Sequence, residues 1–175
     1  MNDRLKSIVD LDKYPIHDLN SPSIKKLIDK CKNELEENSC STISNFILPQ
    51  SLEIMNSELE KQLEEVYMSK ESINAYLYAK DDPSLPEDHP KRNFMNRYNG
   101  YLNSDCFPKS SEMKYLYETE ELLKFVSACL GVSPIYRWAD PLACHAYNVM
   151  KPDGILPWHF DSCEFTLSLM IQKPE

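Results

Sequence analysis

The sequence contains very little glycine, and its glycines are widely separated. Gly100, Gly131 and Gly154 are the only ones among 175 residues. No two of them are close enough to form a GxGxxG fingerprint or a Walker A loop, which excludes those two modes of nucleotide binding. Twelve prolines stand against these three glycines, so the turns are expected to be rigid rather than flexible.

Long apolar runs and excess positive charge are also lacking. No apolar run approaches the ~20 residues that span a bilayer, and residues 1–15 have no apolar core typical of a secretory signal. Lys and Arg total 19 while Asp and Glu total 28, for a net charge of −9. Nucleic acids and anionic lipids bind clustered positive charge. We therefore expect a soluble, cytoplasmic domain with no nucleic-acid or membrane partner.

Cysteine is present without a metal-binding spacing. None of the six cysteines forms a CxxC pair, so a zinc knuckle is not expected. In a reducing cytosol we expect free thiols, several of them buried.

Helical periodicity dominates the first three quarters of the chain. Apolar residues recur at helical spacing over 22–37, 50–68 and 112–130. Ser21 before Pro22 is typical of an N-cap, and Gly131 is typical of a C-cap. Residues 1–20 show no clear period and are expected to be a poorly ordered lead-in.

The segments that predict strands and loops are shorter than the helical segments. Residues 42–48 and 72–79 are expected to be strands, and the Pro- and Asp-rich part of 80–111 indicates an ordered loop. Strands are then predicted at 134–150, 155–161 and 164–172. The last of these, EFTLSLMIQ, is a near-continuous apolar run of the buried kind.

These elements predict an α+β fold. A mainly helical region with a few strands covers 1–131, and a β-core starts in 132–175. Three strands close a core poorly, and the most apolar strand would lie at an edge. We therefore expect the natural fold to continue beyond Glu175.

The stretch Trp158-His159-Phe160-Asp161 carries the chemistry. Side chains alternate along a strand, so His159 and Asp161 would point the same way and could chelate one ion. Two His and one carboxylate on one face suit non-haem Fe(II), with open positions for co-substrate and O₂. Trp158 and Phe160 would face the other way, as packing. A hydrogen-bonded surface pair remains the alternative for His159 and Asp161.

The surrounding residues resemble a known family. Asn148 stands eleven residues before His159, followed by the turn Lys151-Pro152-Asp153-Gly154. This arrangement resembles the iron(II)/2-oxoglutarate-dependent dioxygenases, which fold as a double-stranded β-helix (jelly roll). The resemblance implies that His159 and Asp161 ligate Fe(II) and that Asn148 hydrogen-bonds 2-oxoglutarate. Met150 replaces a Tyr of nucleic-acid demethylase members, and a strand-end role for Asn148 stays open.

The resemblance also indicates one branch of this dioxygenase family. The stretch from His89-Pro90-Lys91-Arg92 to WHFDSCEFTLSLMIQKPE is similar to the branch that contains amino-acid halogenases and hydroxylases. Halogenases there carry Gly where this chain has Asp161. The resemblance therefore implies hydroxylation, or another oxidation, of a small molecule such as a free amino acid. A peptidyl side chain is the alternative substrate, and the oligomeric state is not indicated.

One part of the family pattern is missing. The distal His ligand and the Arg that binds 2-oxoglutarate lie on later strands, which this sequence does not contain. His145, fourteen residues before His159, is expected to be a satisfied strand histidine. The chain thus resembles the N-terminal portion of a dioxygenase. The alternatives are a truncated, non-catalytic remnant, and a helical interaction module that uses the helices of 50–68 and 112–130.

Overall fold

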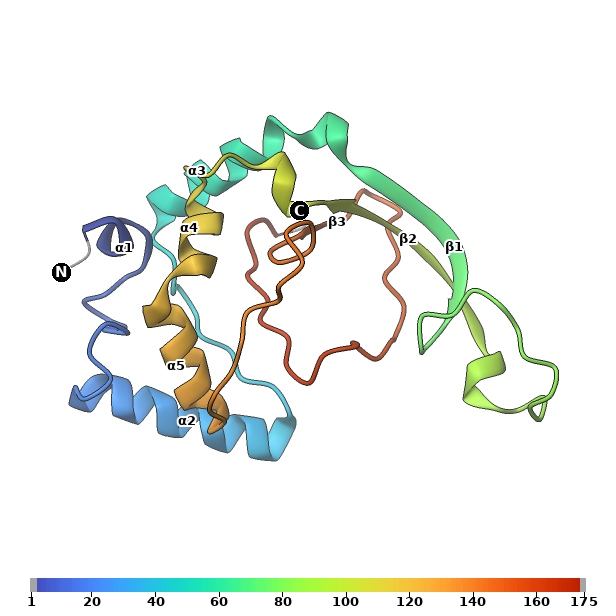
Figure 1. Ribbon diagram of the computed structural model, residues 1–175, viewed down its shortest axis with the longest axis horizontal. Coiled ribbons are helices and arrows are strands. Elements are labelled where there is room, and N and C mark those ends of the chain that lie inside the picture. The colour runs from blue at the N-terminus through green and yellow to red at the C-terminus, as the bar shows by residue number, and fades with distance from the viewer. Residues whose placement is uncertain (1–2, 174–175) are drawn as a thin grey trace.

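A computed structural model describes residues 3–173, an α+β arrangement of helices beside a curved antiparallel sheet (Figure 1). The α+β class is confirmed, while the three strands of the described residues do not amount to a jelly roll. In chain order the elements are α1 Asp3–Ile8, α2 Pro22–Asn38, α3 Pro49–Glu60, β1 Tyr67–Asn74, β2 Phe94–Leu102, α4 Glu112–Glu118, α5 Glu120–Leu130 and β3 Tyr147–Val149, with single 3₁₀ turns at Leu63–Glu65, Pro90–Arg92 and Ser104–Cys106.

Helix α2 follows its sequence signals closely. The Ser21 hydroxyl accepts the N–H of Ile24, and Pro22 occupies the first turn. These contacts satisfy or remove amide donors that have no partner inside a helix. The buried face of α2 includes Ile28 and Cys31, and it packs against α5. The predicted helix and its N-cap are therefore confirmed.

The predicted helix over 112–130 is present but divided. Thr119 has an extended backbone between α4 and α5, and its hydroxyl donates to the Leu116 carbonyl at 2.8 Å. Such a bond offers the backbone an alternative to the helical ladder. Gly131 ends α5 with a φ of 69°, a conformation that glycine adopts without penalty. Its predicted C-cap role is confirmed.

The prediction of one helix over 50–68 is wrong in its second half. Helix α3 ends at Glu60, a 3₁₀ turn follows at Leu63–Glu65, and Tyr67 already belongs to β1. Leu63 is 49% exposed, so the apolar pattern after residue 60 does not mark a buried helical face. Backbone pairing with β2 organises the end of this segment, from Tyr67 onward.

The expectation of a disordered lead-in is wrong for residues 3–20, while residues 1–2 lie outside the described part. Leu5, Ile8 and Val9 are almost fully buried, and Val9 forms a β-bridge with Ile47. A six-residue helix is too short to reveal a period. That bridge is also the only β pairing found for the strand predicted at 42–48 within the described chain.

The longest strand lies within residues 80–111, the least regular part of the sequence, and begins directly after the loop predicted for the Pro- and Asp-rich residues 81–93. Strand β2 pairs antiparallel with β1 from Tyr67↔Tyr101 to Asn74↔Phe94, and with β3 on its other side. The strand expected at 72–79 therefore begins and ends earlier. Asn74 ends it, because its side-chain oxygen accepts the N–H groups of Tyr76 and Tyr78.

The strands predicted after residue 132 are mostly absent from the described chain. Only Tyr147–Val149 forms β3, and Ile155 returns to β2 in a bridge with Tyr98. The predicted turn at 151–154 therefore connects two points on the same side of β2, because Val149 pairs with Gly100 and Ile155 pairs with Tyr98. Residues 164–172 form no strand, and Leu167 and Met170 are 64% and 67% exposed. An apolar run forms a buried strand only where a neighbouring backbone pairs with it.

None of the helices in the described part of the chain has the length and hydropathy of a membrane span. The helices gather on one side, and the chain after β3 runs below the concave side of the sheet (Figure 1).

Candidate functional site

The structure brings His159 and Asp161 together. The Nε2 atom of His159 lies 3.3 Å from Oδ1 of Asp161, with side-chain exposures of 24% and 48%. Both side chains are therefore accessible to a small ion. The predicted juxtaposition is present although residues 156–163 form no strand.

A second contact defines the proton position on His159. Its Nδ1 atom lies 2.8 Å from the Pro157 carbonyl oxygen. A carbonyl oxygen can only accept, so Nδ1 carries the proton and donates it. When the ring is neutral, Nε2 presents its lone pair toward Asp161. This tautomer is the one that ligates metals through Nε2, because a bonded Nδ1–H fixes the orientation of the ring.

The carboxylate of Asp161 is oriented by a neighbouring hydroxyl. Thr166 donates to Oδ2 at 2.6 Å, which leaves Oδ1 directed at the imidazole. A lone pair and a carboxylate oxygen at 3.3 Å repel each other unless a proton or a cation lies between them. A proton on Nε2 satisfies this contact as a hydrogen-bonded pair. With Nε2 unprotonated, the same two atoms would offer one nitrogen and one oxygen ligand to a cation, a donor set that suits Fe(II).

The other two residues of the motif, Trp158 and Phe160, differ in their contacts with the rest of the protein. Phe160 donates its N–H to the Ala75 carbonyl at 2.8 Å, and its ring lies 5.2 Å from that of Tyr76. These contacts fasten the motif to the turn after β1. Trp158 is 88% exposed, so the prediction that it packs against the protein is wrong.

Asn148 lies on β3, away from the His–Asp pair. It pairs with Tyr101, and its side-chain oxygen accepts from Asn99 at 2.8 Å. Phe160, by contrast, is attached beyond the Asn74↔Phe94 end of the ladder. The strand between these points rises about 3.3 Å per residue, which separates them by on the order of 20 Å along β2. The structure does not bring Asn148 and His159 together.

Sequence reasoning missed a polar cluster on the sheet. Arg97 and Asn99 lie on one face of β2, and Asn99 is fully buried. The Arg97 Nε–H donates to Asn99 at 2.8 Å, and its Nη1 lies 3.5 Å from the Glu71 carboxylate. The guanidinium carbon also lies 4.8 Å from the centre of the Tyr101 ring. The sequence signal that could have predicted this cluster is the placement of polar residues at alternate positions of one strand.

The Arg97 guanidinium in this cluster places a positive charge on the sheet and has further N–H groups that could donate hydrogen bonds. Guanidinium has five N–H groups, and two of them are engaged by Asn99 and Glu71. With its side chain 15% exposed, Arg97 could pair with a carboxylate without moving far.

No third ligand accompanies the pair. Across residues 3–173, no group of three or more His, Cys, Asp or Glu side chains is arranged to hold a metal ion. His145 does not join His159, and it lies outside any strand, so its prediction as a strand residue is wrong. Its Nε2 is buried without a partner within the described residues, so it is not satisfied either.

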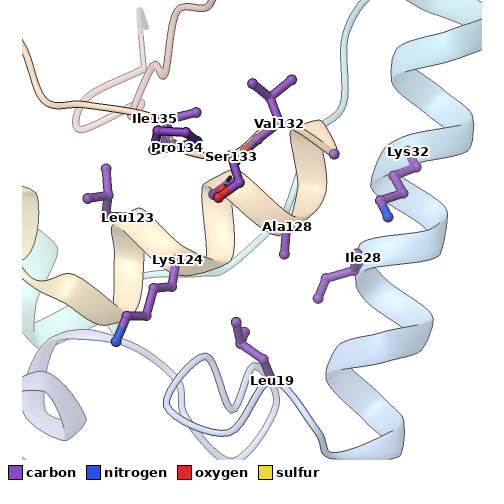
Figure 2. Close-up of a pocket in the computed structure, with 12 residues that line it drawn as sticks. Leu19, Ile28, Lys32, Leu123, Lys124, Ala128, Val132, Ser133, Pro134 and Ile135 are labelled. Carbon is purple, nitrogen blue, oxygen red and sulfur yellow. Dashed lines mark hydrogen bonds between the residues drawn. The ribbon is translucent and has the colours of Figure 1, made fainter.

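A separate groove lies between α2, α5 and the chain after Gly131 (Figure 2). It has a volume of about 500 Å³ and a largely apolar lining that includes Ile28, Leu123 and Ile135, with Lys32 and Lys124 as its charged residues. None of the predicted site residues lines it, so it is distinct from the His–Asp pair.

Comparison of the chain with protein-family models, curated proteins and solved structures gave no match. The resemblance to dioxygenases therefore remains a prediction from the motif.

Proposed function

We propose that this chain forms part of an iron(II)/2-oxoglutarate-dependent oxygenase that hydroxylates a small molecule, such as a free amino acid. The observation that supports the proposal is the His159–Asp161 pair, in which Nδ1 of His159 contacts the Pro157 carbonyl and Nε2 lies 3.3 Å from Oδ1 of Asp161. Fe(II) with 2-oxoglutarate and O₂ would supply the oxidising power that no side chain has.

The residues of this chain would bind the metal ion and hold its ligands in position. His159 and Asp161 would contribute two of the three protein ligands, while Pro157 and Thr166 hold their orientation. Further strands packed on 164–172 would supply the third ligand. The exposure of Leu167 and Met170 favours such packing, because large apolar side chains gain free energy when they are covered.

The polar sheet face suits a substrate that carries charge of both signs. Arg97 would pair with a carboxylate, and Glu71, 40% exposed, would pair with an ammonium group. A free amino acid presents both groups. Asn148 lies at the β3 end of the sheet and would contact 2-oxoglutarate only if 2-oxoglutarate bound at that end.

The test is anaerobic Fe(II) binding, measured by equilibrium dialysis and by the visible charge-transfer absorption that Fe(II) gives with a bound 2-oxo acid. We expect His159→Gln and Asp161→Asn each to weaken Fe(II) binding by at least about tenfold, since each removes a ligand. Asp153→Asn, at an exposed carboxylate in the nearby turn, is the matched control and should leave binding unchanged.

Equal Fe(II) affinity in all four proteins would contradict the proposal. Binding that depends on both residues, without succinate formation from 2-oxoglutarate in the presence of amino acids, would instead favour the remnant alternative.

A further inference from the structure

A thiol and an imidazole lie in contact just before β3. The Sγ atom of Cys144 is 3.1 Å from Nδ1 of His145. Contact between a nucleophile and a base is the basic requirement for activating a cysteine. This pair is separate from His159 and Asp161 and plays no part in the proposed function.

The buried residue Ser104 holds the pair in place. Its hydroxyl accepts the backbone N–H of His145 at 3.0 Å and lies 3.4 Å from the sulfur of Cys144. Ser104 is fully buried, and its own N–H donates to the Leu142 carbonyl at 2.8 Å. Both members of the pair are thereby fixed to the turn after β2 by bonds to one internal residue.

The imidazole is in a state that can accept a proton. His145 is 9% exposed, and its ring lies 5.6 Å from that of Tyr117. Burial lowers the pKa of His145, Lys114 lowers it further, and Glu118 opposes the shift. The neutral ring is the form that can accept a proton, and its contact with the sulfur places Nδ1 where it can take the thiol proton.

His145 also carries an orphaned polar atom. Its Nε2 is buried and has no hydrogen-bond partner within the described residues. An unpaired buried polar atom lowers stability, because it has given up its contact with water without gaining a partner. Such atoms are rare in folded proteins, and a catalytic or redox role is one of the accepted reasons for them.

Cys144 is distinguished from the other five cysteines by accessibility and by its neighbour. Cys31 and Cys129 are buried, Cys40 and Cys163 are exposed, and Cys106 is partly exposed without an imidazole in contact among the described residues. Cys163 has a hydroxyl neighbour, Thr166, at 3.6 Å but no imidazole among its hydrogen-bond partners. Cys144 is partly exposed and alone combines access with a contacting base.

From this geometry we propose that Cys144 is a modification site for hydrogen peroxide, with His145 as its general base. The sulfur attacks one peroxide oxygen while Nδ1 of His145 takes the thiol proton. The S–O bond forms as the O–O bond breaks, and the departing hydroxide recovers the proton from the imidazolium to leave as water. Sulfur is oxidised by two electrons to a sulfenic acid, and peroxide is reduced by two. A small thiol can then condense with the sulfenic acid to form a mixed disulfide and release water.

The test follows sulfenic acid formation at each cysteine of the full chain, without iron or 2-oxoglutarate and with a chelator present. The protein is exposed to hydrogen peroxide, trapped with dimedone and read by peptide mass spectrometry. We expect Cys144 to be labelled at least about tenfold faster than Cys163, because general-base assistance is worth 10²–10⁴-fold where it operates fully. Cys163 is the matched control within the same molecule.

Two variants separate chemistry from structure. His145→Asn keeps a polar group near the position of Nδ1 but cannot act as a base at neutral pH, and it should bring the Cys144 rate down to that of Cys163. His145→Gln should do the same, and thermal melts establish that each variant is folded. Equal rates at Cys144 and Cys163 in the unmodified protein would overturn the proposal, as would a Cys144 rate unchanged in a folded variant. Neither result depends on whether the protein binds Fe(II).

Discussion

The N-terminal segment offers the sharpest test of the fold, because the sequence showed no period there while the structure buries it. Ile8 in α1 is completely inaccessible to solvent. Its carbonyl accepts the Leu48 N–H at 2.8 Å, which ties α1 to the start of α3. Truncation to alanine removes three carbons, and each buried CH₂ is worth about 0.8 kcal/mol. With the cavity contribution, Ile8→Ala should cost about 3.5 kcal/mol, inside the 2–5 kcal/mol usual for such changes.

Urea unfolding followed by circular dichroism measures this loss directly. In a chain of this size 1 kcal/mol shifts Tm by about 2–4 °C, so a thermal melt should fall by about 7–14 °C. Lys6→Ala, on the exposed side of the same helix, is the matched control and should stay within about 0.5 kcal/mol of the unmodified protein.

A loss below about 1 kcal/mol for Ile8→Ala would refute the reasoning. Ile8 would then contribute no more than a surface residue. The original expectation of a poorly ordered lead-in would be restored.

Two further predictions concern the sheet and the pH dependence of stability. Gly100→Ala should destabilise by about 1–3 kcal/mol, because an added Cβ would lie 2.5 Å from Val66 Cγ1 and 3.2 Å from the Val149 carbonyl oxygen; urea unfolding checks it, and an unchanged midpoint would contradict the close packing of β2. The pKa of His145 is lowered by folding from its ordinary 6.5, so the unfolded chain binds the proton first, and stability should fall as pH drops from about 6.5 through the lower folded pKa. His145→Asn should flatten this part of the profile, and an identical slope in that variant would show that another group is responsible.

The features foreseen correctly from the sequence are those set by local chemistry. Ser21 caps α2 through a bond to an amide three residues ahead, and Gly131 ends α5 because it accepts a left-handed backbone. Both interactions lie within one helical turn, so a short stretch of sequence contains all the information needed. The split at Thr119 was missed because the apolar pattern continues across it.

The predictions of strands failed because strand pairing depends on residues that are distant in the sequence. The side chains that β2 buries on one face include Asn99, which sequence patterns assign to the surface, whereas the apolar run at 164–172 is largely exposed. Strand formation depends on a partner backbone that lies far away in the sequence. Periodicity therefore identified apolar segments without identifying which of them would find partners.

His159 and Asp161 lie close together as the sequence predicted, but for a different reason. Alternation along a strand was expected to align His159 and Asp161, yet residues 156–163 form no strand. Local hydrogen bonds from the imidazole to Pro157 and from Thr166 to the carboxylate hold the pair instead. The geometry within the pair is thus set by contacts no more than five residues long, while the Phe160 bond to Ala75 fixes where the motif lies, and neither requires the strand that the sequence predicted.

This explanation gives Thr166 a specific role in orienting Asp161. Thr166→Val removes the donor at nearly constant shape, and Thr166→Ser restores it. Loss of a bond that orients a metal ligand typically lowers affinity 10–100-fold, so Fe(II) binding to the Val variant should weaken by about tenfold or more, while the Ser variant stays close to the unmodified protein. Dialysis against Fe(II) under anaerobic conditions distinguishes the two. If the Val and Ser variants bind Fe(II) equally well, the carboxylate is oriented by the backbone alone, and the hydrogen bond at 2.6 Å is a consequence of its position rather than its cause.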